Sequence, residues 1–228
     1  APLTQKAVFW RSFWQRLLVW PFVRTFARIR VRGYENVKDL QGPVMFCPNH
    51  ISPIDGTIIL KALPSRFQAR TAIASASDVV YENPAVKSHV KKLEILFNVY
   101  PFSRETQVKS SLEYTGRLLD RGFSIMLFPE GHMARQGKLQ PVKLGAGLIA
   151  IQMGVPIVPV GVTGVDKMVP PDAEGLMMPH KAVSDVVFGK PLVFPVGTPV
   201  HDAARQIHDA LAQILPPEML DTTGAVGD

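Results

Sequence analysis

Short apolar runs bounded by glycine or proline alternate with stretches of helical periodicity along most of the chain, which is typical of strands alternating with helices. The runs predict strands at 44–47, 71–75, 95–100, 124–128, 157–162 and 186–188. Apolar residues at three- and four-residue spacing predict helices at 54–63, 83–92, 106–121, 144–153 and 200–215. This alternation predicts an α/β fold, a single domain whose mixed, largely parallel central sheet is flanked by helices.

The segment 1–32 carries a different pattern, that of an amphipathic helix pair. On a helical wheel, large apolar residues gather on one half: Phe9, Trp10, Phe13, Trp14, Leu17, Leu18 and Trp20. The opposite half holds Arg11, Ser12, Gln15 and Arg16. Pro21 should end or kink this helix, and a second short helix at 22–29 again separates aromatic from arginine side chains. We therefore predict two parts, a helical appendage at 1–32 and one compact domain at 33–228.

Charge narrows the interpretation of this appendage. The chain has a net charge of +6, and its first part contains seven cations before the first acid, namely Lys6, Arg11, Arg16, Arg24, Arg28, Arg30 and Arg32. A nucleic-acid-binding protein normally spreads positive charge over its folded surface, so this confinement argues against nucleic acid as a partner. Aromatic and arginine faces suit a membrane lipid surface, with rings among headgroups and guanidinium groups at lipid phosphates. The alternative is a helix pair that packs its apolar faces on the core, with the arginines in water, and both interpretations hold if only part of each face is buried.

Neither a transmembrane span nor a secretory signal is predicted, because Arg11 and Arg16 interrupt the apolar run of the appendage. We expect instead a peripheral protein at the cytoplasmic face of a membrane. Cys47 is the single cysteine, so an internal disulfide is excluded and a reducing compartment is favoured. It lies in an apolar run and is interpreted as a small core residue.

The most informative chemistry follows the first predicted strand, in the segment Asn49-His50-Ile51-Ser52-Pro53-Ile54-Asp55. His50 should lie where the strand opens into a loop, and Asp55 should begin the next helix. A carboxylate beside an imidazole fixes its tautomer and stabilises the imidazolium that forms when the ring takes a proton. The pair is therefore suited to general-base catalysis on a hydroxyl, a role worth about 10²–10⁴-fold in rate. A loop histidine near a helix cap is the structural alternative.

Three further motifs lie downstream. They are Tyr100–Arg104, Phe128–Gly131, which the cations Arg135, Lys138 and Lys143 follow, and Val155–Val160. Ligand sites in open α/β sheets gather outside the carboxyl ends of strands. Arginine and lysine suit phosphate binding there, the first through paired hydrogen bonds and the second as a point charge.

Together these motifs resemble the glycerolipid acyltransferase family, whose best-known members acylate glycerol 3-phosphate or lysophosphatidic acid. The resemblance runs from about Gly42 to Val162 and touches all four blocks of the family. His50 and Asp55 match its Asn-His-x-x-x-x-Asp catalytic motif, with Asn49 also present. Phe128–Gly131 and Val155–Pro159 match the third and fourth blocks.

The resemblance also implies the residues that bind substrate, which are Asn49, Arg104, Glu130, Gly131, Arg135 and Lys143. One departure concerns the acceptor. After Glu-Gly the family continues Thr-Arg-Ser, whereas this chain reads His132-Met133-Ala134, so the arginine expected at position 133 is missing. Arg135 is a candidate replacement, and an acceptor other than a simple phosphomonoester is the alternative.

The activity that the resemblance implies is transfer of a fatty acyl group from acyl-CoA or acyl carrier protein to a hydroxyl in phospholipid biosynthesis. The expected acceptor is 1-acylglycerol 3-phosphate, and a glycolipid is the alternative. His50 would remove the hydroxyl proton while Asp55 holds the imidazole, and neither a cofactor nor a metal is expected. A non-enzymatic membrane lipid-binding protein with the same fold is the alternative from another class.

Other chemistries have weaker signals in this sequence. Gly145–Ala150 fits G-x-G-x-x-A, but the strand that a dinucleotide site needs before it is almost absent, and close helix packing explains these small residues. Gly122–Met126 lacks the final glycine of a serine-hydrolase elbow. No metal-ligand spacing links the remaining histidines, His89, His132, His180, His201 and His208.

Overall fold

The computed structural model of the chain describes residues 4–76, 90–103, 108–134, 136–173, 177–220 and 226–227. Its centre is a seven-stranded sheet in the order β1-β8-β7-β2-β5-β3-β4. The strands are β1 (Ala27–Arg32), β2 (Met45–Pro48), β3 (Thr71–Ala76), β4 (Val99–Phe102), β5 (Ser124–Met126), β7 (Ile157–Thr163) and β8 (Ala182–Phe188). Neighbouring strands are parallel except β7 and β8, which are antiparallel. This mixed, largely parallel sheet confirms the predicted fold class.

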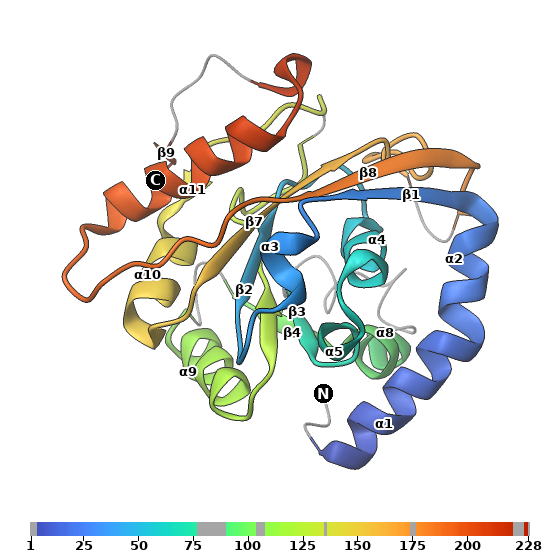
Figure 1. Cartoon of the computed structure of the whole chain (residues 1–228), viewed down its shortest axis with the longest axis horizontal. Coiled ribbons are helices and arrows are strands. Elements are labelled where there is room, and N and C mark those ends of the chain that lie inside the picture. The colour runs from blue at the N-terminus through green and yellow to red at the C-terminus, as the bar shows by residue number, and fades with distance from the viewer. Residues whose placement is uncertain are drawn as a thin grey trace.

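Helices cover both faces of the sheet (Figure 1). One face carries α9 (Val108–Asp120), α10 (Leu144–Met153) and α11 (Val200–Ile214). The other carries α4 (Asp55–Ala62), α5 (Ser65–Gln68), α8 (Val90–Phe97) and the N-terminal helices. The short elements are α3 (Glu35–Lys38), the 3₁₀ turn η2 (Pro217–Met219) and a two-stranded sheet of β6 (Val142–Lys143) and β9 (Val226–Gly227). Successive β2 residues enter opposite cores, Phe46 on one side and Met45 and Cys47 on the other, because strand side chains alternate between faces.

The strand predicted at 95–100 is wrong in its first half. The helix α8 continues to Phe97, and β4 begins only at Val99. Asn98 separates them with a φ of 54°, a left-handed conformation that asparagine tolerates better than most residues. The apolar run therefore contains the end of a helix and the start of a strand. The helix predicted at 83–92 falls partly on 83–89, outside the described residues.

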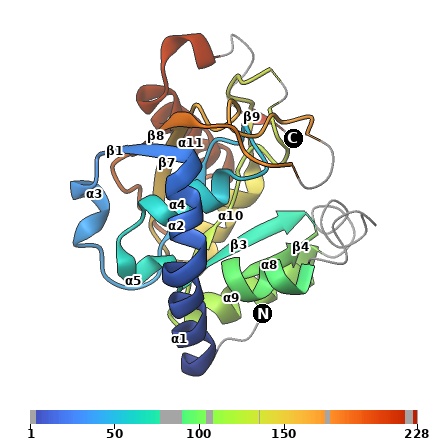
Figure 2. The ribbon, with the colours of Figure 1, turned by 90° about the vertical axis from the view of Figure 1, so that its right-hand side faces the viewer.

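The N-terminal helix pair is present, but its second helix is shorter than predicted. Elements α1 (Gln5–Trp14), η1 (Gln15–Val19) and α2 (Trp20–Phe26) follow one another as a single rod (Figures 1 and 2). Pro21 does not end it, because the preceding turn η1 is a wider π-helix, in which Trp20 N–H donates to the Gln15 carbonyl. The predicted helix at 22–29 is corrected to end at Phe26.

Residues 27–32 form β1 instead, an edge strand of the central sheet. Their sequence alternates arginine with alanine, isoleucine and valine, which is the two-residue period of a strand. The boundary predicted after residue 32 therefore falls at the end of a strand of the main sheet. The helical appendage proper comprises α1, η1 and α2.

The first half of the rod turns Arg11 and Gln15 inward and its aromatic residues outward, whereas Trp20 at the start of α2 is buried. Arg11 and Gln15 are each 1% exposed, whereas Phe9 is 63% and Leu18 is 57% exposed. The Arg11 guanidinium donates to the carbonyls of Ile95 and Ala69, each at 2.9 Å, and to Asn98 Oδ1 at 3.1 Å. The expectation that Arg11 faces lipid phosphate or water is therefore wrong. The alternative, in which the apolar face packs on the core, holds at Trp20, which is 4% exposed, but not at the exposed aromatic residues of α1.

We predict that Arg11→Ala lowers the free energy of unfolding by about 3 kcal/mol, because it leaves buried carbonyl acceptors without their charged donor. Burial lowers the pKa of Arg11 to about 10, so the guanidinium stays charged at neutral pH. Urea unfolding followed by far-ultraviolet circular dichroism measures the change. Arg16→Ala, which removes an exposed arginine of the same rod, is the matched control and should change stability by less than about 0.5 kcal/mol. Equal effects of the two substitutions would contradict the anchoring role.

Candidate active site

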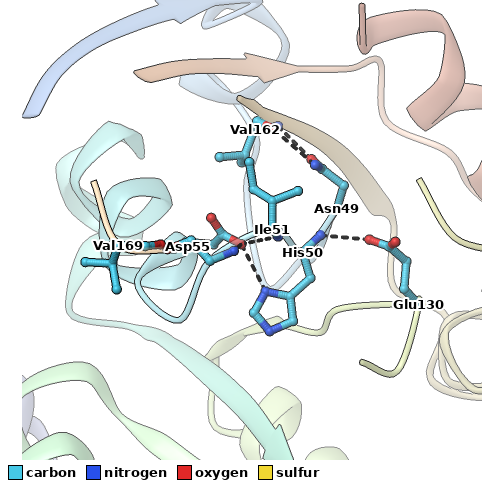
Figure 3. Close-up of polar contacts among 8 residues, drawn as sticks. Asn49, His50, Ile51, Asp55, Glu130, Val162 and Val169 are labelled. Atoms are coloured by element: carbon cyan, nitrogen blue, oxygen red, sulfur yellow. Dashed lines mark hydrogen bonds and ion pairs between the residues drawn. The ribbon is translucent and has the colours of Figure 1, made fainter. Parts of the chain in front are cut away.

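Parallel pairing brings three chain segments to one edge of the sheet. Strand β2 lies between β5 and β7 and runs parallel to both, so the carboxyl ends of all three strands meet there. His50 follows β2 and Glu130 follows β5, while Val162 lies near the end of β7. Figure 3 shows these residues converging on the loop that carries His50.

The His50–Asp55 pair forms as predicted from their spacing. His50 Nδ1 lies 2.9 Å from Asp55 Oδ2. The same oxygen accepts the backbone N–H groups of Ile51 at 2.7 Å and Ser52 at 2.8 Å, so the loop wraps around the carboxylate. Asp55 is also the first residue of α4, and a helix N-terminus favours a negative charge. The loop and the helix together fix the carboxylate that orients the imidazole.

Exposure differs sharply between the two partners. The Asp55 side chain is fully buried, whereas 22% of the His50 side chain is exposed. Burial raises the pKa of Asp55, and the hydrogen bond from His50 and the two backbone N–H groups oppose that rise. The carboxylate is therefore shielded from solvent, while the imidazole can reach a bound substrate.

The orientation of the ring defines which nitrogen can act as a base. A carboxylate only accepts hydrogen bonds, so we assign the ring proton to His50 Nδ1, and Nε2 keeps a free lone pair. Nε2 points away from Asp55 (Figure 3). Phe128 stacks on the ring, with a centroid separation of 4.0 Å and an interplanar angle of 29°. A ring held by Asp55 and Phe128 can take a proton at Nε2 without reorienting.

Glu130 supports the backbone of the catalytic loop. It lies in a turn closed by the Gly131 N–H and the Phe128 carbonyl, and Pro129 occupies the second turn position, which proline favours. One Glu130 oxygen accepts His50 N–H and the other accepts Gln140 N–H, each at 2.7 Å. The residue is completely buried. The structure thus gives Glu130 a role in positioning His50.

Burial gives Glu130 a measurable effect on stability. It raises the pKa of Glu130 from 4.5 to about 8, against the two backbone N–H groups that lower it. The folded protein therefore keeps a proton that the unfolded chain releases between these two values, and the free energy of unfolding falls as pH rises through that window. We predict that Glu130→Gln, which cannot ionise, flattens this fall. Urea unfolding at pH 5 and pH 8 measures the fall in the free energy of unfolding. Glu218→Gln, which changes an exposed carboxylate, is the control. A fall in Glu130→Gln as large as in wild type would contradict the prediction.

Asn49 fastens the loop to the neighbouring strand. Its Nδ2 donates to the Val162 carbonyl at 3.0 Å, and its Oδ1 accepts Val162 N–H at 2.7 Å. The Ser52 hydroxyl donates to the Val169 carbonyl at 2.7 Å. Both side chains are buried and occupied by backbone groups, so Asn49 positions His50 and does not itself face a substrate. Sequence reasoning did not single out Ser52 or Phe128, although both lie inside the motifs.

Gly131 and Lys143, which the resemblance named as substrate-binding residues, lie next to this loop. Gly131 has a φ of 76°, a left-handed conformation that favours glycine, and a Cβ placed on it would lie in ordinary contact with Lys143 Cγ at 3.4 Å. Lys143 N–H donates to the Pro129 carbonyl at 2.8 Å, which ties its strand to the Glu130 turn. The Lys143 side chain is exposed. Arg104 and Arg135 lie outside the described residues.

No three histidine, cysteine, aspartate or glutamate side chains gather as metal ligands within the described ranges. In the same part of the chain, no helix combines the length and the apolar character needed to cross a membrane.

Comparison with known proteins places this site in a family. The family model described as Acyltransferase matches residues 28–163, which is more than half of the chain and includes the whole His50 site. This chain belongs to the acyltransferase family.

The similar proteins have related names. The chain is 28% identical to the chloroplastic 1-acyl-sn-glycerol-3-phosphate acyltransferase BAT2 of Brassica napus over 197 residues, covering 85% of this chain and 52% of that protein. It is 27% identical to the chloroplastic 1-acyl-sn-glycerol-3-phosphate acyltransferase LPAT1 of Arabidopsis thaliana, over 73% of this chain and 43% of that protein. The chain thus spans about half the length of these relatives.

A solved structure shows the same fold. The crystal structure of the 1-acyl-sn-glycerophosphate (LPA) acyltransferase PlsC from Thermotoga maritima superposes with a TM-score of 0.67, at 19% sequence identity. The match covers 90% of this chain and 77% of that chain.

Proposed function

We propose that this protein transfers a fatty acyl group from a thioester donor to the hydroxyl of 1-acylglycerol 3-phosphate, in phospholipid biosynthesis. The observation that carries the proposal is the geometry of His50: its Nδ1 is held by a buried carboxylate at 2.9 Å, and its other nitrogen points away from that carboxylate. Membership of the acyltransferase family and the names of the relatives support this chemistry and this acceptor.

The proposed reaction uses His50 as the general base. Its Nε2 takes the proton of the acceptor hydroxyl as that oxygen attacks the thioester carbonyl, and Asp55 offsets the charge of the imidazolium. The tetrahedral intermediate then collapses, the carbon–sulfur bond breaks, and the leaving thiolate takes the proton from the imidazolium. The products are an ester and a free thiol, and His50 returns to its neutral form. Each step uses side chains of this chain, and we propose that neither a metal nor a cofactor takes part.

Cations beside the dyad would bind the anionic groups of the substrates. Lys143, whose strand is tied to the Glu130 turn, is the described candidate for the acceptor phosphate. The resemblance adds Arg104 and Arg135. Met133 stands where the family carries an arginine, and this difference keeps a glycolipid as the alternative acceptor. Both acyl-CoA and acyl carrier protein are proposed donors.

We further propose that the N-terminal rod holds the protein on the cytoplasmic face of a membrane as a peripheral protein. Exposed aromatic and leucine side chains along the rod support this docking, namely Phe9, Trp10, Phe13, Trp14, Leu17, Leu18 and Phe22. Tryptophan and phenylalanine beside arginine suit the interfacial depth of a bilayer. Docking would bring His50 to substrates that partition into lipid.

The purified protein, incubated with radiolabelled acyl-CoA or acyl carrier protein and a panel of acceptors, tests the proposed reaction. The panel contains 1-acylglycerol 3-phosphate, other lysophospholipids, glycerol 3-phosphate and glycolipids. We expect labelled diacylglycerol 3-phosphate together with an equal amount of free thiol. Transfer to glycolipids alone would show that the acceptor is a glycolipid and not 1-acylglycerol 3-phosphate. Absence of transfer from either donor to any acceptor would reject the proposed activity.

A further inference from the structure

A recess with two cations lies where α2, β1 and α4 meet. It has a volume of about 260 Å³ and is lined by Arg24, Ala27, Ile29, Val31, Lys61 and Ala62. In Figure 1 this corner lies at the junction of the N-terminal rod with the main sheet, beneath β1. None of its lining residues belongs to the loop that carries His50.

The chemistry of the recess is amphipathic. Arg24 and Lys61 supply the charge, and the other lining side chains are aliphatic. The ammonium of Lys61 lies 5.7 Å from the centroid of the Trp20 ring, which fixes its position on the rod side of α4. Among the residues lining this recess none is acidic, and neither cation has a carboxylate partner within the described residues. Two neighbouring positive charges over an apolar floor suit an anion that is attached to an apolar body.

The electrostatics of Lys61 agree with this geometry. Partial burial and the charge of Arg24 both lower the pKa of Lys61. The two cations therefore repel each other, and no acidic residue lines the recess to neutralise them. An anion placed between them would relieve this repulsion. The repulsion therefore favours a bound anion at this corner.

The surroundings of the recess indicate where such an anion comes from. Arg24 lies on the same rod as the exposed aromatic residues of α1, two of which, Phe9 and Phe13, line a second recess of about 390 Å³ with Arg16. A surface that places rings at headgroup depth also places nearby arginines at the level of lipid phosphates. The volume of the first recess is below the roughly 300–1,000 Å³ of sites that enclose a whole small molecule, so it suits a headgroup better than an entire lipid.

We propose that this recess binds the phosphate headgroup of an anionic glycerolipid in the membrane, at a site separate from the catalytic dyad. The inference rests on the proposed docking of the rod on a membrane. Helix α4 links the two sites, because it begins at Asp55 and carries Lys61 about 9 Å further along its axis. A headgroup held by Arg24 and Lys61 would thereby fix the orientation of the dyad relative to the lipid surface.

The test compares binding to vesicles of phosphatidylcholine alone with binding to vesicles that also contain phosphatidylglycerol. We expect wild type to prefer the anionic vesicles, and Arg24→Gln/Lys61→Gln to weaken that binding about tenfold or more. Arg121→Gln/Lys190→Gln, which removes two exposed cations elsewhere, is the matched control and should lose less than about threefold. Arg24→Lys/Lys61→Arg should bind as wild type does. Equal losses in both glutamine variants, or no preference of wild type for anionic vesicles, would overturn the site.

A second arm distinguishes a lipid from a free anion. The indole N–H signal of Trp20, next to Lys61, is followed by NMR while inorganic phosphate is added without lipid. We expect millimolar phosphate to leave the signal in place; saturable movement would assign the recess to a free anion and overturn the lipid proposal.

Acyl transfer to detergent-dispersed acceptor separates this inference from the proposed reaction. The Arg24→Gln/Lys61→Gln variant should transfer acyl groups there as fast as wild type, and a loss there would overturn the site. If wild type shows no acyl transfer, only the proposed reaction is rejected. The vesicle comparison would still show whether the recess binds an anionic headgroup.

Discussion

His50→Ala is expected to lower the rate of acyl transfer by about 10³-fold or more, because it removes the group that takes the hydroxyl proton. The fold should survive. The backbone of residue 50 donates its N–H to Glu130 and accepts Ala134 N–H at 2.8 Å, and neither bond needs the imidazole. Initial rates of thiol release with 1-acylglycerol 3-phosphate measure the effect.

His201→Ala is the matched control, since it removes an exposed histidine of α11. It should keep the full rate. Both variants should bind vesicles as wild type does, because the N-terminal rod is unchanged. Turnover of His50→Ala within a few-fold of wild type would rule out His50 as the base.

Asp55→Asn should lower the rate by about 10²–10⁴-fold. It should also lower the free energy of unfolding by about 1–3 kcal/mol, because its amide N–H groups replace Asp55 Oδ1, which is buried without a hydrogen-bond partner among the described residues. The amide oxygen can accept the same three donors that Asp55 Oδ2 accepts, from His50, Ile51 and Ser52. A neutral amide cannot offset the charge of the imidazolium, so the loss appears in the chemical step. The measurement is kcat for the single variant and for His50→Ala/Asp55→Asn.

The double variant distinguishes a catalytic carboxylate from a structural one. If Asp55 acts only through His50, the double variant is as slow as His50→Ala alone, because residues that act as one unit are not additive. Losses that multiply would show that Asp55 serves the fold or the substrate independently of His50. Glu218→Asn, which changes an exposed carboxylate, should leave kcat unchanged.

The sequence predicted the parts of this molecule that depend on local pattern. Strand–helix alternation predicted the α/β sheet, and the break after the apolar run at 44–47 placed His50 at a sheet edge. The five-residue step to Asp55 was sufficient because both residues belong to one loop and the first turn of α4. The contact between His50 and Asp55 could therefore be predicted without knowledge of the tertiary structure.

The positioning residues could not be recognised in that way, because their partners are distant in sequence. Asn49 pairs with Val162, 113 residues away, and Glu130 holds His50 across 80 residues. A polar side chain beside a catalytic histidine is compatible with substrate contact or with backbone support. Only the parallel arrangement of β2, β5 and β7 showed that these two residues support the loop.

The orientation of the N-terminal rod could not be predicted either, because it too depends on partners that are distant in sequence. A helical wheel separates two faces but does not tell which one contacts the protein. Arg11 of the polar face is buried because its guanidinium finds acceptors on Ala69, Ile95 and Asn98, the last of them 87 residues away. The strand β1 had a local signal, the alternation of arginine with aliphatic residues. This signal directly follows a helical pattern, so the first residues of the strand were included in the helix predicted at 22–29.

The proton position on His50 tests the proposed mechanism most directly. A long-range ¹H–¹⁵N correlation spectrum of the ¹⁵N-histidine-labelled protein, with His50→Ala to assign the signals, reports which ring nitrogen carries the proton in the neutral form. The mechanism predicts a proton on Nδ1, shared with Asp55, and a bare Nε2. A proton on Nε2 would contradict it, because that nitrogen could then not accept the hydroxyl proton.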